Sequence, residues 1–202
     1  MARETKLLVP LLVFLASSVV APASNASVSV ALTVDDVARA SVLVARVVPR
    51  EQSSSWVDGH IVTTTRLGVE SVLAGAGVAG SEVHVRTLGG IVGDVGQRVE
   101  GEPRFTAGAP SIVFLARDVR AGGDAAAPFV VAGRAQGQLV VARDGSGHDV
   151  VRVVGTGGLV ERRQRVPLAP SANAPLVTTL DGRSADDATR EVVLAWRRTH
   201  AH

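Results

Sequence analysis

The chain has 202 residues, no cysteine, a single lysine at position 6 and a formal net charge of +2 at pH 7. The lack of cysteine excludes a disulfide framework, a thiolate-ligated metal site and a lipoprotein anchor on a cysteine. A near-neutral charge gives no electrostatic basis for nucleic-acid binding, and an aromatic content of 3% predicts a core of aliphatic side chains.

Residues 1–26 have the three-part layout of a secretory signal peptide, with a short basic start, an apolar run over Leu7–Val20 and small residues after it. The run of about 14 residues is shorter than the roughly 20 that a bilayer-spanning helix needs. Cleavage fits after Ala26 or, less well, after Ala23, and an uncleaved amino-terminal anchor is the alternative. We therefore expect export to the periplasm or the extracellular medium, with no membrane span in the mature chain.

A β-barrel domain is predicted over residues 27–154, and it begins with a short helix over residues 34–40. Thr33 can cap this helix, and Asp36, three residues later, completes an acidic variant of the capping box. After the helix, the apolar run SVLVARVV, which starts at Ser41, fits a strand that is buried on both faces.

The next segments alternate between strand and turn signals. PREQSSSWVDGH, residues 49–60, is polar and is predicted to be a hairpin region that turns at Asp58-Gly59. HIVTTTRLGVESVL follows as a strand, and period-two counting places on one shared face Ile61, Thr63, Thr65, Leu67, Val69 and Leu73. Residues 82–87 resume the alternation, with two valines and Thr87 on one side.

Glycines interrupt the stretch RTLGGIVGDVGQRVEGEPRF, residues 86–105. Their spacing is not the Gly-x-Gly-x-x-Gly that opens a dinucleotide-binding helix, and no Gly-Lys-Ser or Gly-Lys-Thr follows as a P-loop requires. Bulges or bends at a barrel corner explain these glycines better. If residues 98–105 are extended, Glu100, Glu102 and Arg104 line one face, which is explained best as a solvated strand face.

The second half of the chain adds strands and then a helix. Strands are predicted at residues 111–115 and within 129–154, where Asp144-Gly145 supplies a hairpin turn. Residues 155–180 lack periodicity and are predicted to be an irregular arm or linker. Residues 181–202 are predicted to be a helix capped by Ser184 and Asp187, and helical spacing is shown by Ala188, Val192, Ala195 and Trp196.

This order of elements predicts a mainly β fold. It is either a small OB-like barrel or a strongly bent antiparallel sheet, with a short N-terminal helix and a C-terminal helix.

Four side chains are candidates for a binding surface: Trp56, His84, Arg86 and Arg104. Trp56 lies in a polar segment, where its indole either contacts a partner or folds back over the barrel end. His84 and Arg86 are predicted to point to solvent from the same side of a strand. Arg104 follows the glycine-rich stretch.

Other polar clusters are explained better as structural features than as catalytic or metal-binding sites. Ser146, His148 and two nearby aspartates lie within six residues, but a single hairpin tip accounts for them, and Ser146 lacks the Gly-x-Ser-x-Gly turn of a hydrolase nucleophile. The histidines do not pair with an acidic residue at a metal-binding helical spacing. We expect no catalytic residue, no cofactor and no physiological metal.

A resemblance extends over residues 32–117, through the segments VLVARVV, TTTRLGVESVLAG, VHVRTLGG and VGQRVEGEPRFTAGAPSIVFLA. These resemble a group of uncharacterised secreted proteins from high-GC, myxobacteria-like genomes, most specifically at Phe105, Gly108, Val113, Phe114 and Leu115. More distantly, the chain is similar to the OB-like barrel of netrin-like modules and tissue inhibitors of metalloproteinases. Those inhibitors depend on an amino-terminal cysteine that this chain lacks. The resemblance therefore implies the fold and export, and it does not imply protease inhibition.

Together these patterns favour an exported, non-catalytic β-barrel module that binds an unknown protein partner or an envelope component. An exported hydrolase, or an accessory factor to one, with a site assembled on the barrel surface is the alternative, because a fold of this kind can carry a site on any face. A third hypothesis is a structural role in an envelope assembly, through an arm at residues 155–175.

Overall fold

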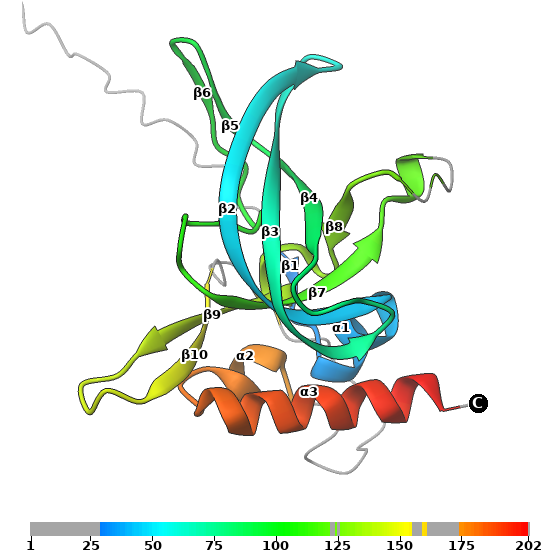
Figure 1. Cartoon of the computed structure of the whole chain (residues 1–202), viewed down its shortest axis with the longest axis vertical. Coiled ribbons are helices and arrows are strands. Elements are labelled where there is room, and N and C mark those ends of the chain that lie inside the picture. Colours follow the sequence, from blue (N-terminus) through cyan, green and yellow to red (C-terminus); the bar gives the residue numbers. More distant parts are fainter. Residues whose placement is uncertain (1–28, 122–123, 125, 155–158, 161–173, 202) are drawn as a thin grey trace, which may run out of the picture.

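The computed structural model describes residues 29–121, 124, 126–154, 159–160 and 174–201 (Figure 1). The predicted signal peptide, residues 1–26, lies outside the described residues. Among the helices in these ranges, none has the length and apolar character that crossing a bilayer requires.

Within the described residues, a barrel is formed by five strands: β2 (Leu43–Val57), β3 (His60–Gly75), β4 (Glu82–Leu88), β7 (Ser111–Arg117) and β8 (Phe129–Val131). β2, β3 and β4 form an antiparallel meander, and β7 pairs antiparallel with both β2 and β8. β8 also pairs with β4, in parallel, through Val85 and Phe129, which closes the ring. The prediction of a mainly β, OB-like barrel is confirmed, although this one parallel pair makes the sheet mixed rather than antiparallel.

The remaining strands extend or decorate the barrel. β9 (Gln138–Arg143) pairs with β7, and β10 (Asp149–Val153) pairs with β9, so that the described sheet has seven strands. β5 (Gly90–Val92) and β6 (Val95–Gln97) form a separate hairpin. β1 (Ser29–Val30) pairs in parallel with β11 (Leu159–Val160), which brings two distant parts of the chain together.

Two of the three α-helices match the predictions from sequence. α1 spans Val34–Ala40, and both hydrogen bonds of the capping box between Thr33 and Asp36 are present. α3 spans Ala185–His200, and the Ser184 hydroxyl accepts a hydrogen bond from the backbone N–H of Asp187. The inner face of α3 carries the alanines and the valine expected from the periodicity.

The third α-helix, α2 (Leu176–Leu180), corrects the prediction of an irregular arm over residues 155–180. Its five residues are too few to show a helical period, but Leu176 and Leu180 are both fully buried. Two short 3₁₀ turns, Val119–Ala121 and Arg134–Gly137, complete the described elements. Residues 155–158 and 161–173 of the predicted arm lie outside the described residues.

Two hydrophobic clusters share the central strands. One fills the barrel, and the other lies between the sheet and the helices, with alternate residues of β2 and β7 pointing into each. Leu43 and Ala45 point into the barrel, whereas Val44 points to the helices. This division explains why the run from Ser41 to Val48 is almost continuously apolar, because a strand that is buried on both faces shows no alternation.

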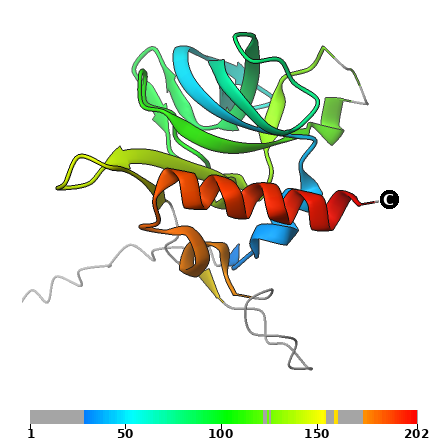
Figure 2. The same ribbon diagram turned by 60° about the horizontal axis from the view of Figure 1, so that its bottom comes forward.

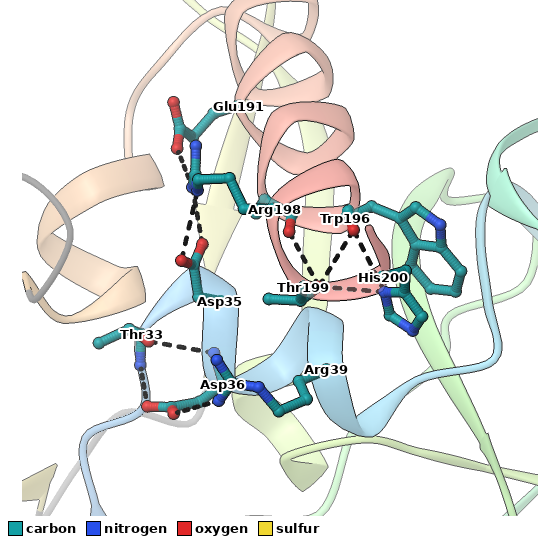
Figure 3. Close-up of polar contacts among 10 residues, drawn as sticks. Thr33, Asp35, Asp36, Arg39, Glu191, Trp196, Arg198, Thr199 and His200 are labelled. Atoms are coloured by element: carbon teal, nitrogen blue, oxygen red, sulfur yellow. Dashed lines mark hydrogen bonds and ion pairs between the residues drawn. The ribbon is translucent and has the colours of Figure 1, made fainter. Parts of the chain in front are cut away.

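Polar contacts tie the two ends of the described chain together. The guanidinium of Arg198 on α3 bonds both Asp35 on α1, at 2.6 Å, and Glu191, seven residues earlier on α3, at 3.0 Å (Figure 3). The hydrogen bond to Asp35 raises the pKa of Arg198. Beside this contact, the rings of Trp196 and His200 stack with their centroids 3.8 Å apart. Figure 2 shows α3 lying across the base of the sheet, with α1 and α2 beside it.

The hairpin predicted over residues 49–60 is confirmed, with its turn at Asp58-Gly59. Its polar residues 49–57 are the outer part of β2, and the face of one residue in β3 differs from the prediction. Leu73 does not share the face of Leu67 and Val69: it packs against the cluster under the helices, because a register shift between Val69 and Ser71 inserts one extra residue into β3 and reverses the alternation.

Candidate functional site

The mouth of the barrel is bordered by two hairpins, here called the arms. The first is the outer part of β2 and β3, residues 49–66, and the second is β5–β6. Hydrogen bonds hold the second arm against the first: the Gln97 Oε1 accepts the backbone N–H of Ile61 at 2.6 Å, and the carbonyl of Ile61 accepts the N–H of Gly89 at 2.7 Å. In Figure 1 both arms project from the same end of the molecule.

Glycine lets the arms approach each other closely. Gly90 has φ +138°, and a Cβ atom there would lie 2.2 Å from Thr63 Oγ1 and 2.5 Å from Ser54 Oγ. Neither distance is compatible with a side chain at this position. The prediction that these glycines shape the chain is therefore confirmed at Gly90, where the second arm crosses the first.

A cleft of about 380 Å³ opens between the arms and the barrel interior. It is lined by β3, β4, the second arm and the segment that follows it: Gln52, Thr63, Thr65, Thr87, Leu88, Gly89, Gly90, Ile91, Gly96, Gln97, Arg98, Val99, Glu102, Pro103, Arg104 and Phe105. Volumes of roughly 300–1,000 Å³ are usual for small-molecule sites.

Three threonines form the floor of the cleft. Thr63 donates its hydroxyl to the carbonyl of Gly89 at 2.6 Å, and Thr87 makes a long contact of 3.4 Å to the carbonyl of Thr63. Thr65 is fully buried, and its Oγ1 has no hydrogen-bond partner among the described residues. The sequence predicted all three to point inward but gave no reason to expect a site there. The missed signal is the change from threonine to aliphatic residues along the inward face of β3.

Glu102 stands between this cleft and a second hollow of about 350 Å³. Its Oε2 accepts the backbone N–H of Leu88 at 2.9 Å, and its Oε1 accepts from Arg134 Nε at 2.7 Å. Arg86 and Asp118 line the second hollow and bond each other. The Glu102 carboxylate is therefore part of the framework that separates the two hollows.

Arg104 lies at the rim of the first cleft on a firmly held backbone. The buried amide of Gln138 accepts the N–H of Arg104 at 2.9 Å and donates to its carbonyl at 2.8 Å. The neighbouring Arg98 is paired with Glu100 at 2.6 Å. In the part of the chain that the structure describes, no side-chain hydrogen bond or ion pair engages the guanidinium of Arg104.

The four candidate residues are divided between two faces. Trp56 is 53% exposed on the first arm, so it does not fold back over the barrel end, and Arg104 lies at the cleft. His84 is exposed on the outer face of β4, and Arg86 on the same face is held by Asp118. The structure therefore brings Trp56 and Arg104 to the barrel mouth but places the other two outside it.

The condition for a shared strand face over residues 98–105, an extended backbone, is not met. A turn at Glu100 and Gly101, where φ is +75°, breaks the segment, so Glu100, Glu102 and Arg104 do not line one strand face. The turn directs Glu102 inward to partners 14 and 32 residues away in sequence.

The polar cluster at Asp144–Asp149 is a hairpin tip between β9 and β10, as predicted. Asp144 Oδ1 accepts the backbone N–H groups of His148, at 2.9 Å, and Ser146, at 2.8 Å. These bonds lower the pKa of Asp144. Between the described side chains of Ser146 and His148 no hydrogen bond is formed, so the nucleophile and base of a triad are not assembled here.

Comparison of the chain with protein-family models, curated proteins and solved structures finds no match. The resemblance to secreted proteins and to netrin-like modules therefore stays a prediction from the residues quoted above. The barrel mouth is therefore the candidate functional site.

Proposed function

We propose that the protein is an exported, non-catalytic barrel module that binds a macromolecular partner or an envelope component through its arms. The observation that carries this proposal is the exposure of apolar side chains on both arms, where Trp56 is 53%, Ile91 72% and Val95 49% exposed. These three residues are called the arm surface. Single exposed apolar residues are common, but several on two adjacent hairpins, one of them with an indole, are typical of a protein contact.

Strand geometry indicates how the side chains of the arm surface point. Ile91 and Val95 point to opposite faces of the second arm, because Val95 pairs with Val92. Trp56 lies on the same face of β2 as Ser54, because side chains two residues apart point the same way. Ser54 Oγ bonds Thr63 Oγ1 at 2.8 Å, beneath the point where Gly90 crosses. The indole is therefore on the side of the first arm that faces the second arm. Rigid aromatic side chains in such positions often contribute most to binding energy.

The polar groups of the cleft favour binding over hydrolysis. Both oxygens of Glu102 are engaged, one by a backbone N–H and one by Arg134, as expected of a structural carboxylate rather than of a general acid or base. The hydrolase hypothesis consequently has less support than a binding role.

Export is supported by the layout of residues 1–26. We expect the mature chain to begin at Ser27, after cleavage at Ala26. Amino-terminal sequencing of the protein from periplasmic and culture-medium fractions measures this directly. Recovery of the intact amino terminus from the cytosol contradicts the proposal.

The binding proposal is tested by capture from envelope and secreted fractions with the wild-type protein and with Trp56→Ala. Leu194→Ala is the matched control, since Leu194 is 48% exposed on α3, away from the arms. We expect a specific partner that is retained by wild type and by the control, and lost from Trp56→Ala. Equal recovery by all three proteins, or recovery by none, argues against the arm surface.

A further inference from the structure

The cleft at the barrel mouth combines a cation at its rim with a hydroxyl at its floor, and neither has a partner among the residues that the structure describes. Arg104 supplies the first and Thr65 the second, as described above. A buried polar group without a partner is unfavourable, and such groups in folded proteins call for an explanation. A ligand that contacts both groups explains why neither has a partner among the described residues.

The charges of the lining favour an anion with a single charge. Its charged residues are Arg98, Glu102 and Arg104, a net charge of +1. Arg98 is paired with Glu100, and Glu102 with Arg134, so that Arg104 carries the excess. A guanidinium binds a carboxylate through two parallel hydrogen bonds, and a dianion is less well matched here because Glu102 lines the same cleft.

The uncharged residues that line the cleft indicate what kind of chemical group carries the anion. Leu88, Pro103 and Phe105 make an apolar wall, and Phe105 is 8% exposed. The floor offers threonine hydroxyls, and rotation of Thr65 about χ1 exchanges its buried hydroxyl with its methyl group. A short stem of aliphatic and hydrogen-bonding groups suits this lining, whereas a large aromatic or highly charged stem does not.

We infer that the cleft binds a carboxylate on a short stem, with Arg104 holding the carboxylate and the stem directed to the floor at Thr65. The carboxylate belongs either to a free small acid or to the carboxyl terminus of a peptide. The inference goes beyond the proposed arm surface and does not depend on it, because Trp56 is not part of the cleft lining.

The backbone of Arg104 is suited to this role because Gln138 fixes it from both sides. Gln138 is 1% exposed and belongs to β9, so the rim is attached to the central sheet. A preorganised backbone reduces the conformational cost of holding a ligand. The side chain itself stays free to meet the carboxylate.

The test uses protein purified from cells that express the full-length chain. Three probes are titrated while the backbone amide signals of Leu88, Gly89 and Phe105 are followed by NMR: lactate, the peptide Ac-Ala-Ala-OH and its amide Ac-Ala-Ala-NH₂. We expect at least one carboxylate probe to bind in the millimolar range and the amide to bind at least tenfold more weakly. Binding of lactate identifies a free-acid site, and binding of the peptide acid alone identifies a peptide terminus.

Variants locate the contact. Arg104→Gln is expected to weaken the carboxylate probe about tenfold, whereas Arg197→Gln, the same change at an exposed position of α3, leaves binding unchanged. Thr65→Val is expected to weaken binding of the same probe severalfold without unfolding the protein.

The inference is overturned if the acid and the amide bind equally, if neither acid binds, or if Arg104→Gln binds like wild type. It is also overturned if inorganic phosphate, added as a further probe, replaces the carboxylates as the Arg104-dependent ligand. Trp56→Ala should bind the probe normally, which keeps this test separate from that of the arm surface.

Discussion

The hydroxyl of Thr65 has no hydrogen-bond partner among the described residues of the barrel, and the loss of its contacts with water is therefore uncompensated. Valine has nearly the same shape but no hydroxyl. We expect Thr65→Val to raise the free energy of unfolding by about 1 kcal/mol, as measured by urea denaturation.

Thr63→Val is the matched comparison, because the hydroxyl of Thr63 donates to Gly89 at 2.6 Å and also bonds Ser54. It should lower the free energy of unfolding by about 1–2 kcal/mol, since it leaves those two groups without their partner. A shift of the same sign in both variants contradicts the assignment of the unpaired hydroxyl.

Asp187 supplies a prediction of pH dependence at the start of α3. The Ser184 hydroxyl donates to its carboxylate, and Arg190 lies beside it, so its pKa is lowered. Folding thus favours the charged form, and this stabilisation is present above the ordinary carboxyl pKa of about 4 and is lost as the pH falls through the lowered value.

We accordingly expect Asp187→Asn to melt at a lower temperature than wild type at pH 7, and the two melting temperatures to converge as the pH falls through the lowered pKa of Asp187. Asp186→Asn is the control for the removal of a charge from the same helical turn. A difference between Asp187→Asn and wild type that does not shrink as the pH is lowered contradicts this account.

At the scale of elements, the crossing of the two arms depends on Gly90. Alanine at this position meets two side-chain oxygens and has to adopt a positive φ, so we expect Gly90→Ala to lower the free energy of unfolding by about 2 kcal/mol or more. Gly96→Ala, on the other strand of the same hairpin, has only an ordinary contact at 3.9 Å with Ile91 and should change stability little. Equal effects of the two substitutions in urea denaturation argue against the crossing.

The elements that the sequence predicts well are those whose boundaries are set by residues close together in the sequence. The bounds of α1 follow from Thr33 and Asp36, which are three residues apart, and the arm turn follows from Asp58-Gly59. By contrast, the outer part of β2 is exposed along most of its length and is a strand because β3 pairs with it, which no hydrophobic pattern reveals.

The cleft could not be predicted for a related reason. Its framework carboxylate, Glu102, is directed by Leu88 and Arg134, and the backbone of Arg104 is fixed by Gln138, 34 residues further along the chain. Period-two counting gave the inward direction of Thr63 and Thr65, but which end of the barrel stays open depends on how the second arm folds back.

At the scale of the whole molecule, the C-terminal helix is integral to the core. Val192 on α3 is fully buried in the same cluster as Val37 on α1 and Leu139 on β9. We expect Val192→Ala to lower the free energy of unfolding by about 2 kcal/mol, with the urea midpoint falling equally by Trp196 fluorescence, followed in a Trp56→Phe background, and by far-ultraviolet circular dichroism. Leu194→Ala, at the exposed position on the same helix, is the control. Separate midpoints from the two probes show that α3 unfolds independently of the barrel.

The order of the elements along the chain has a consequence for the timing of folding. A chain is synthesised from its amino end, and α3 follows all the barrel strands in sequence, so these strands leave the ribosome before α3 does. Val44 and Phe114, which lie in the cluster that α3 completes, have no complete apolar surroundings until then. The barrel therefore waits for a helix that is translated later before its second hydrophobic face is covered.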